Sequence, residues 1–249
     1  MLSYQLTHYP ETAFGGYTRV DGTIAFYLRV NSLCEPSFTV ADFGCGRGAH
    51  QDDPVRIRRQ LRVLRGKVAK VIGLDIDPVA RTNPFIDEFH LLTDPRWPML
   101  DSSVDLCIAD TVLEHLEEPD DFFSECRRVL RTDGYLCIRT PNVWSYVGIA
   151  ARILSNRIHG KLLRRVQEER KEVDVFPTLY RCNSMPRLRG RLTANGFRHV
   201  VYGHEAEPSY LSFARSAYRF GALHQRFSPN QLRPVIFAFA QAVERDGQS

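Results

Sequence analysis

Short apolar runs and longer amphipathic stretches alternate along the chain. The apolar runs have the length of buried strands and predict seven of them, over residues 38–43, 68–74, 88–92, 104–109, 135–140, 197–203 and 235–242. The stretches between them have helical spacing, as in residues 22–33, which follow the helix-capping residue type Asp21, and in residues 119–130. Strands that alternate with helices predict an α/β fold with a mostly parallel sheet.

Two stretches do not fit this alternation. Residues 143–182 precede the helix that leads into the sixth strand, and residues 209–229 separate the sixth strand from the seventh. Both are rich in aromatic and charged side chains, and we expect them to form one helical cap at the carboxyl end of the sheet. With 249 residues, the chain is long enough for a single domain, residues 1–249, that carries these two insertions.

Composition narrows the class of protein. The chain is 43% hydrophobic and 25% charged, which is typical of a globular protein, and no apolar run reaches the ~18 residues that a membrane-spanning helix needs. The first residues lack the pattern of a signal peptide. The six cysteines occur singly, without a C-x-x-C pair, and are expected to be reduced core residues. These features predict a cytoplasmic protein without a membrane span.

Positive charge is concentrated in one segment, residues 54–70, although the net charge of the chain is only +4. The segment contains no acidic residue and seven cations: Arg56, Arg58, Arg59, Arg62, Arg65, Lys67 and Lys70. Such a run can bind phosphate, nucleic acid or anionic lipid. It can equally be a solvated helix face, and we favour this second interpretation.

A glycine loop follows the first predicted strand, in the stretch TVADFGCGRGAH of residues 39–50. Glycine suits positions with positive φ or with a backbone that approaches a ligand closely. A strand, a glycine loop and a helix in this order place backbone N–H groups at the ligand crevice of an open α/β sheet. Gly44, Gly46 and Ala49 also satisfy the dinucleotide pattern G-x-G-x-x-G/A, so the loop alone leaves a nicotinamide-dependent oxidoreductase open. Asp42 and the long insertion before Asp75 disfavour that alternative.

Five motifs in order distinguish these possibilities. They are DFGCGRG, VIGLDIDP, TDPRWPM, SVDLCIADTVLEHL and VLRTDGYLCIRTPN. Together, over residues 38–142, they resemble the class I S-adenosylmethionine-dependent methyltransferases. The resemblance implies a Rossmann-like, doubly wound, mostly parallel seven-stranded sheet with an antiparallel last strand, and S-adenosyl-L-methionine as the cofactor.

The resemblance also implies which residues hold the cofactor: Asp42, Gly44, Gly46, Gly48, Asp75, Ile76, Asp94 and Asp110. Asp75, at the end of the second strand, can accept hydrogen bonds from both ribose hydroxyls, with Asp77 as a rival. Ile76 would lie against the adenine ring, and Asp94 would read its edge unless it only forms a turn before a proline. Asp110, at the end of the fourth strand, would face the same crevice.

Methyl transfer is an in-line displacement, for which the protein mainly has to orient the acceptor and exclude water. An alcohol acceptor also needs a base, and His115 is the candidate because it follows the fourth strand and histidine is a common general base. In the alternative interpretation, Glu114 and His115 are structural and begin the following helix. No spacing of His, Asp or Glu suggests a metal.

The acceptor is less well defined by the residues. The tail of the chain resembles methyltransferases of bacterial cell-surface polysaccharide assembly, which favours transfer to oxygen of a small-molecule, saccharide or lipid-linked acceptor. An RNA methyltransferase that uses residues 54–70 is the first alternative, although no RNA-binding module accompanies them. A non-catalytic relative that serves as a binding or scaffold protein is the second alternative.

Overall fold

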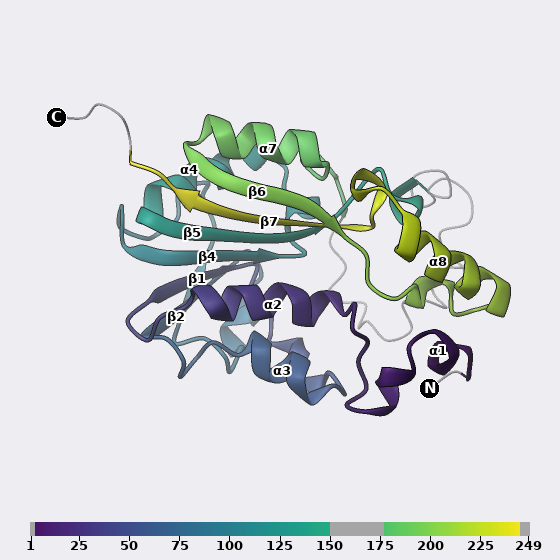
Figure 1. Cartoon of the computed structure of the whole chain (residues 1–249). Helices are drawn as coiled ribbons and strands as arrows, with labels where there is room; N and C mark the ends of the chain where they lie inside the picture. The colour runs from purple at the N-terminus through teal and green to yellow at the C-terminus, as the bar shows by residue number, and fades with distance from the viewer. Residues whose placement is uncertain (1–2, 150–176, 245–249) are drawn as a thin grey trace.

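A seven-stranded sheet forms the centre of the protein in the computed structural model, which describes residues 3–149 and 177–244 (Figure 1). The strands follow the order β3-β2-β1-β4-β5-β7-β6. Their bounds are β1 Thr39–Phe43, β2 Lys70–Asp75, β3 Glu88–Leu91, β4 Val104–Asp110, β5 Leu130–Pro141, β6 Phe197–His204 and β7 Val235–Ala242. The pairs from β3 to β5 are parallel, whereas β7 is antiparallel to both β5 and β6. The predicted Rossmann-like sheet with an antiparallel last strand is confirmed.

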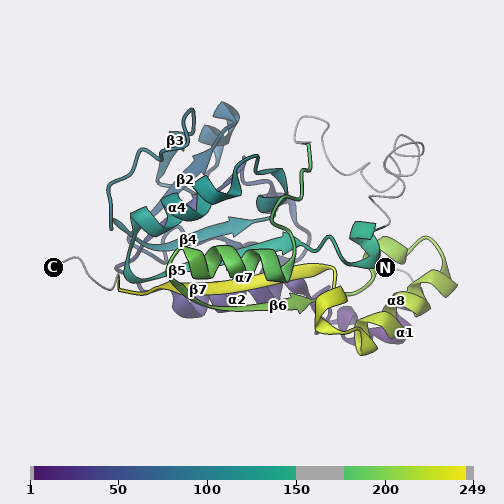
Figure 2. The same ribbon diagram turned by 90° about the horizontal axis from the view of Figure 1, so that it is seen from above.

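Helices cover both faces of the sheet (Figures 1 and 2). On one face lie α2 (Gly22–Leu33) and α3 (Arg56–Arg62), and on the other lie α4 (Pro119–Val129) and α7 (Met185–Ala194). Each face has its own apolar core: Phe26 and Val30 of α2 are fully buried in one, and Phe123 of α4 and Leu188 of α7 in the other. Burying both faces of a parallel sheet in this way explains why its strands read as continuous apolar runs.

The helix that precedes the sheet begins where the sequence predicted. The Asp21 side chain accepts a hydrogen bond from the backbone N–H of Ile24 at 2.9 Å and so caps α2. Asn183, although of a common helix-capping residue type, does not cap α7. Ser184 precedes the helix, and Asn183 instead donates a 2.6 Å hydrogen bond to Thr140 Oγ1. Asn183 is fully buried, so its side chain satisfies a polar group in the core.

The fifth strand begins earlier than the predicted residue 135. Leu130 already pairs with Val104 of β4, and the register then shifts before Tyr135 pairs with Leu106. Residues 132–134 lie within this irregularity, where Asp133 has a φ of +64°. The chain therefore makes its turn as a bulge inside the strand, because pairing with β4 continues on both sides of it.

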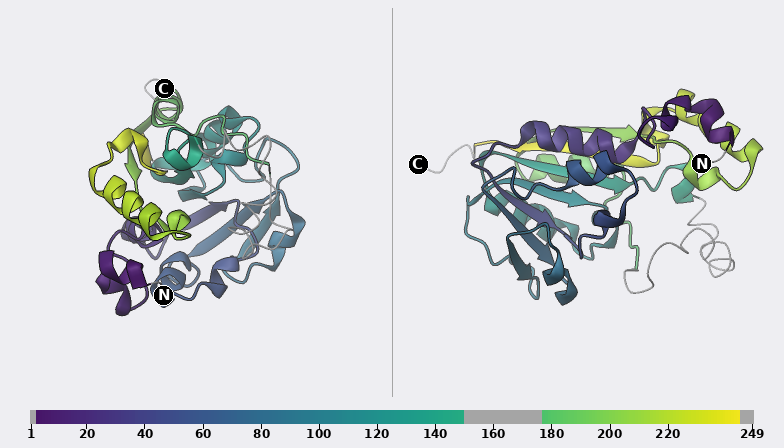
Figure 3. Two further views of the ribbon diagram at one scale, coloured as in Figure 1. Left: turned by 90° about the vertical axis from the view of Figure 1, so that its right-hand side faces the viewer. Right: turned by 90° about the horizontal axis from the view of Figure 1, so that it is seen from below.

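At the carboxyl end of the sheet, the connection between β6 and β7 forms η6 (Ser209–Leu211), α8 (Arg215–Phe227) and η7 (Asn230–Leu232). The first segments of the chain, α1 (Ser3–His8) and η1 (Pro10–Ala13), lie beside α8 (Figures 1 and 3). Tyr218 of α8 packs against the rings of Tyr4 and Tyr9, with centroids 5.2 and 6.4 Å away. The predicted insertion 209–229 is thus helical. Residues 150–176 of the other insertion lie outside the described residues, so a single cap built from both stays a prediction.

No helix among residues 3–149 and 177–244 has the length and apolarity to cross a bilayer.

Candidate functional site

The glycine loop leaves the carboxyl end of β1 with three residues in the left-handed region. The φ angles of Gly44, Gly46 and Gly48 are +72°, +52° and +73°. A Cβ on Gly44 would lie 2.3 Å from Val112 Cγ2, and one on Gly48 would lie 2.7 Å from Asn83 Oδ1. A Cβ on Gly46 would meet nothing within 4 Å. Gly44 and Gly48 therefore pack against other side chains, while Gly46 borders open space at the carboxyl end of the sheet.

Asp75 ties the end of β2 to this loop. The backbone N–H of Gly46 donates to Asp75 Oδ2 at 2.9 Å, and the N–H of Asp77 donates to Oδ1 at 2.9 Å. A carboxylate oxygen accepts more than one hydrogen bond, so both retain capacity for a ligand hydroxyl. Asp77 instead caps η3 (Pro78–Thr82) by accepting from the N–H of Val79. Ile76 between them is 62% exposed. The geometry thus favours Asp75 over Asp77 at the loop.

Asn83 holds the other side of the loop, and the sequence analysis missed it. Its Nδ2 donates to the carbonyl oxygens of Cys45 at 3.0 Å and Gly46 at 3.1 Å, while its Oδ1 accepts from the N–H of Phe85. The side chain is buried. Two hydrogen bonds from this buried amide thus hold the loop against the segment that follows η3, and the third holds the amide to that segment. The Asn-Pro pair at 83–84 is the only sequence signal for a special role here.

We predict that Asn83→Ala loosens the glycine loop. Two carbonyl oxygens of the half-buried loop and one N–H lose their partner, and a buried polar group costs about 1–3 kcal/mol if it is left unsatisfied. The expected result is a fall in the free energy of unfolding of about 2 kcal/mol or more, measured by urea denaturation. Asn31→Ala is the control, because Asn31 Nδ2 also bonds two carbonyl oxygens, of Tyr27 and Leu61, but away from the loop. If only Asn83→Ala also weakens ligand binding, its amide positions the loop.

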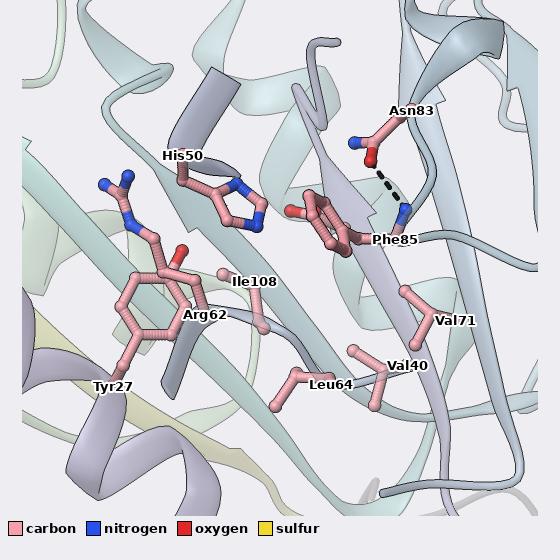
Figure 4. Close-up of a pocket in the computed structure, with 10 residues that line it drawn as sticks. Tyr27, Val40, His50, Arg62, Leu64, Val71, Asn83, Phe85 and Ile108 are labelled. Carbon is pink, nitrogen blue, oxygen red and sulfur yellow. Dashed lines mark hydrogen bonds between the residues drawn. The ribbon is translucent and has the colours of Figure 1, made fainter. Parts of the chain in front are cut away.

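A cavity lies beneath the loop, between the sheet and helices α2 and α3 (Figure 4). The polar and aromatic side chains that line it are Tyr27, Asp42, His50, Arg62, Asn83 and Phe85. The His50 ring packs 4.5 Å from that of Phe85, and burial lowers the pKa of His50 to about 4. Its Nε2 atom is buried without a hydrogen-bond partner among the described residues. A neutral imidazole therefore borders this cavity at neutral pH.

Asp42 is the acidic residue of the cavity. Burial raises the pKa of its carboxyl to about 7, and the negative charges of Asp110 and Asp75 add to this effect, while Arg62 opposes it. The carboxyl group is therefore balanced between its neutral and charged forms near neutral pH. A cationic ligand at this position would favour the charged form.

Asp110 is engaged by cations and a hydroxyl from three elements. Arg139 of β5 donates to its two oxygens at 2.5 and 2.6 Å, Tyr27 of α2 donates at 2.9 Å, and Arg62 Nη2 of α3 lies 3.6 Å away. Although burial opposes it, the Arg139 guanidinium holds the pKa of Asp110 below its usual value. The structure places Asp110 at the carboxyl end of β4 as expected. Its contacts indicate that it positions Tyr27 and Arg62 beside Asp42.

The two remaining predicted residues follow strands on opposite sides of β1, Asp94 after β3 and His115 after β4. Asp94 is exposed after β3 and accepts from Thr93 Oγ1 at 2.9 Å. His115 ends η4 (Leu113–His115), and its Nδ1 lies 2.9 Å from the carbonyl oxygen of Pro177. Since a carbonyl only accepts, Nδ1 is the donor in this hydrogen bond and Nε2 is the basic nitrogen.

Glu114 differs from its neighbour because it is buried. Its carboxylate accepts from Thr140 Oγ1 at 3.2 Å, and its backbone oxygen accepts from the N–H groups of Leu179 and Tyr180. Burial raises the pKa of the Glu114 carboxyl above its ordinary value. These contacts fit a structural role for Glu114 and leave His115 as the candidate base.

The basic segment makes its contacts mostly within the protein. Six of its seven cations have a partner: Arg58 with Asp21, Arg59 with the Asp53 carbonyl, Arg62 with Asp110, Arg65 with Asp87, Lys67 with Asn31 and Lys70 with Glu88. Cations held in this way are less available to a polyanion. The segment therefore supports the interpretation of a structural helix face. Within residues 3–149 and 177–244, no cluster of His, Cys, Asp or Glu could hold a metal ion.

The methyltransferase-domain family matches residues 41–138, which run from within β1 to within β5 and include the whole glycine loop. This part of the chain is thus similar to methyltransferase domains, and the relatives below support the class I S-adenosylmethionine-dependent methyltransferase superfamily. A probable S-adenosylmethionine-dependent methyltransferase of Mycolicibacterium smegmatis is 35% identical over 108 residues, which is 41% of this chain and 38% of the relative. The chain thus matches well under half the length of that curated relative.

Solved methyltransferases share the fold of this domain over most of the chain. A methyltransferase from Archaeoglobus fulgidus is 18% identical, with a TM-score of 0.54 over 96% of this chain and 99% of its own. Geranyl diphosphate C-methyltransferase from Streptomyces coelicolor, solved with S-adenosylhomocysteine, is 14% identical, with a TM-score of 0.52 over 88% and 77%. The predicted superfamily is confirmed, and with it S-adenosyl-L-methionine as the cofactor of this methyltransferase domain.

Proposed function

We propose that this protein transfers a methyl group from S-adenosylmethionine to an oxygen atom of a small-molecule, saccharide or lipid-linked acceptor. The observation that carries the proposal is the open side of the glycine loop. Gly46 borders empty space there, and its neighbour in space, Asp75, has a half-satisfied carboxylate. The exposed Ile76 follows Asp75 directly, at the same carboxyl end of the sheet. The loop is thus a cradle that a side chain would fill but that glycine leaves open.

The residues around this cradle fit the parts of the cofactor. Asp75 would accept hydrogen bonds from the ribose hydroxyls, and Ile76 would contact the adenine, with Asp94 close to its edge. Asp42, supported by the ion pairs of Asp110, would face the positively charged amino-acid end. The cofactor supplies a methyl group on a sulfonium, which is its own leaving group.

The chain would have two further tasks during transfer. It must hold the acceptor in line with the methyl group and exclude water from the site. Holding both reactants in place lowers the barrier, because the entropy cost of bringing them together is met on binding. It must also take the proton of an alcohol acceptor, and His115 Nε2 would accept it while the Pro177 carbonyl fixes the ring through Nδ1.

Thermal unfolding with S-adenosylmethionine, S-adenosylhomocysteine and NADH, each in separate samples, tests the cofactor assignment. Ligand at about 100 times its dissociation constant adds about 2.7 kcal/mol to the unfolding free energy. For a domain of this size, each kcal/mol raises the melting temperature by about 2–4 °C. We expect the first two ligands alone to stabilise. Stabilisation by NADH alone would contradict the proposal, and silence from all three would favour a scaffold protein.

We predict that S-adenosylmethionine binds more tightly as the pH rises through 7. In the ligand-free protein the pKa of Asp42 is raised to about 7, so the carboxyl is mostly protonated at pH 6 and mostly charged at pH 8. A cationic ligand needs the charged form, so binding at pH 6 must release a proton. The affinity should rise about tenfold between pH 6 and pH 8 and then level off. Isothermal titration calorimetry in buffers of different ionisation enthalpy measures both the affinity and the proton release.

The same ionisation affects the ligand-free protein in the opposite direction. Since the pKa of Asp42 is higher in the folded than in the unfolded chain, its contribution to stability falls as the pH rises from about 4 to 7. Asp42→Asn should bind the cofactor weakly with a flat pH profile. An unchanged profile in this variant would assign the titration to another group.

We predict that His115→Asn slows methyl transfer and leaves cofactor binding intact. A positioned general base contributes about 10²–10⁴-fold to the rate. The rate is measured as S-adenosylhomocysteine release with a panel of nucleotide sugars, lipid-linked saccharides and geranyl diphosphate, the last because a fold neighbour binds it. Stabilisation by S-adenosylmethionine serves as the binding control. A rate within a few-fold of the original protein would leave His115 a structural role.

A further inference from the structure

The helix α8 carries an unusual exposed surface. Phe220, Leu223 and Phe227 follow the spacing i, i+3 and i+7, which places them on one stripe, and they are 62%, 59% and 71% exposed. Phe213, just before the helix, is 78% exposed. Large apolar side chains scattered singly over a surface are ordinary, but a stripe on one helix marks an interaction surface.

A basic stripe runs beside the apolar one. Arg215, Arg219 and Arg226 are exposed and follow the spacing i, i+4 and i+11. On an α-helix this spacing places them on a second stripe, about a fifth of a turn from Leu223 and on the same open side of α8. No acidic residue of the described ranges forms an ion pair with any of the three. Residues 208–233 contain four arginines and not one acidic residue. The surface is thus apolar along one half and cationic along the other.

The opposite side of α8 is fixed to the protein. Tyr218 is buried against aromatic rings of the N-terminal segment, and His224 Nδ1 lies 2.8 Å from Glu205 Oε1. A Cβ on Gly221 would lie 2.4 Å from Pro208 Cβ, so the helix packs closely on this connection. With its inner side held by these three residues, α8 presents its two stripes outward.

We infer that α8 docks on an anionic membrane surface. A helix with aromatic and aliphatic residues on one side and arginines on the other lies in the interface, with the apolar stripe among the acyl chains and the cations at the head groups. A lipid surface with negative head groups satisfies both stripes at once, which is the complementarity that selects it. Because α8 connects β6 and β7 at the carboxyl end of the sheet, docking would also turn this end, with the glycine loop, towards the membrane (Figure 1).

Sedimentation of the full-length protein with vesicles tests the inference without any use of methyl transfer. We expect binding to vesicles that contain phosphatidylglycerol, little binding to phosphatidylcholine alone, and weaker binding at high salt. Arg219→Gln/Arg226→Gln should weaken binding about 25-fold, since each arginine near an anionic surface contributes about fivefold. Phe220→Ser/Phe227→Ser should weaken it about tenfold or more, through lost apolar burial.

Matched controls come from α2 and α3, which cover one face of the sheet and are not part of the connection between β6 and β7. Leu28→Ser removes a 54% exposed apolar side chain from α2, and Arg56→Gln removes an exposed cation from α3. Both should bind vesicles like the original protein, and all variants should keep its melting temperature. Equal losses in the controls would overturn the assignment to α8. Failure to bind any vesicle would overturn the inference itself. A dimer that only Phe220→Ser/Phe227→Ser separates would also overturn it, because the apolar stripe would then bind a second copy of the chain. None of these outcomes depends on whether S-adenosylmethionine binds.

Discussion

Gly46→Val is expected to remove S-adenosylmethionine binding and to leave the protein folded. The residue has a φ of +52°, and the space in front of it is empty to 4 Å. A Cβ there meets no protein atom within 4 Å, and a branched side chain built on it occupies the cradle that we assign to the cofactor. Overpacking a closed contact costs about 1–3 kcal/mol, which corresponds to about 5- to 150-fold in the dissociation constant. Isothermal titration calorimetry measures the loss.

Gly66→Val provides the matched control for backbone strain. Gly66 has a φ of +81° and also faces empty space, but it lies in the turn between α3 and β2. Both substitutions force a β-branched residue into the left-handed region, so both should lower the melting temperature by a similar amount. Only Gly46→Val should also lower the affinity. Equal affinities in the two variants would move the cofactor away from the open side of the loop.

Asp110→Asn is expected to cause the largest loss of stability of any substitution discussed. The ion pair with Arg139 is bidentate, and both side chains are only 11% exposed. Arg139 also donates to Thr23 Oγ1 and lies 5.5 Å from the Phe26 ring centroid, so its position depends on several contacts. Removing one charge leaves the other buried without compensation, which costs about 3–5 kcal/mol. Urea unfolding measures the difference in the unfolding free energy.

Two further variants separate the ion pair from general damage. Lys70→Gln breaks the pair with Glu88, whose side chains are 44% and 38% exposed, and should cost at most about 1 kcal/mol. Arg139→Met combined with Asp110→Asn should be more stable than the sum of the single losses predicts, because no unpaired charge remains. Additive losses would show that the two charges do not stabilise each other.

Elements that are determined by local chemistry were predictable from the sequence. The helix at residues 22–33 has the predicted bounds because Asp21 supplies the cap and the apolar positions repeat with helical spacing. The strand at residues 235–242 also has the predicted bounds, since it is a continuous apolar run bordered by proline and charge. The superfamily was recognisable because its motifs lie in contiguous pieces of sequence. The loop conformation was predictable because glycine is the residue type that suits a left-handed backbone, and three glycines alternate there.

Features that depend on distant partners were not predictable. Asn83 reads as a turn residue until the loop carbonyls, 37 and 38 residues away, come within reach of its amide. Asp110 reads as a free carboxylate facing the cofactor until Arg139 pairs with it. An arginine inside an apolar strand was the available signal for that pair, because a buried cation requires a counter-charge. The role of Arg62 was hidden among the other cations of its segment.

The contact between α1 and the connection from β6 to α8 has a consequence for the order in which the chain acquires its structure. Gln5 bonds Glu207 across 202 residues of sequence, and the Tyr4 hydroxyl reaches the Ser212 carbonyl across 208. On the ribosome, residues 4 and 5 must therefore wait for partners that are synthesised more than 200 residues later, while the sheet strands find neighbours much sooner. Closure of so long a loop is slow to nucleate. Residues 4–9 therefore join the structure late. The rings of Tyr4 and Tyr9 stay uncovered until Tyr218 has been synthesised, and a chaperone could bind them during that time.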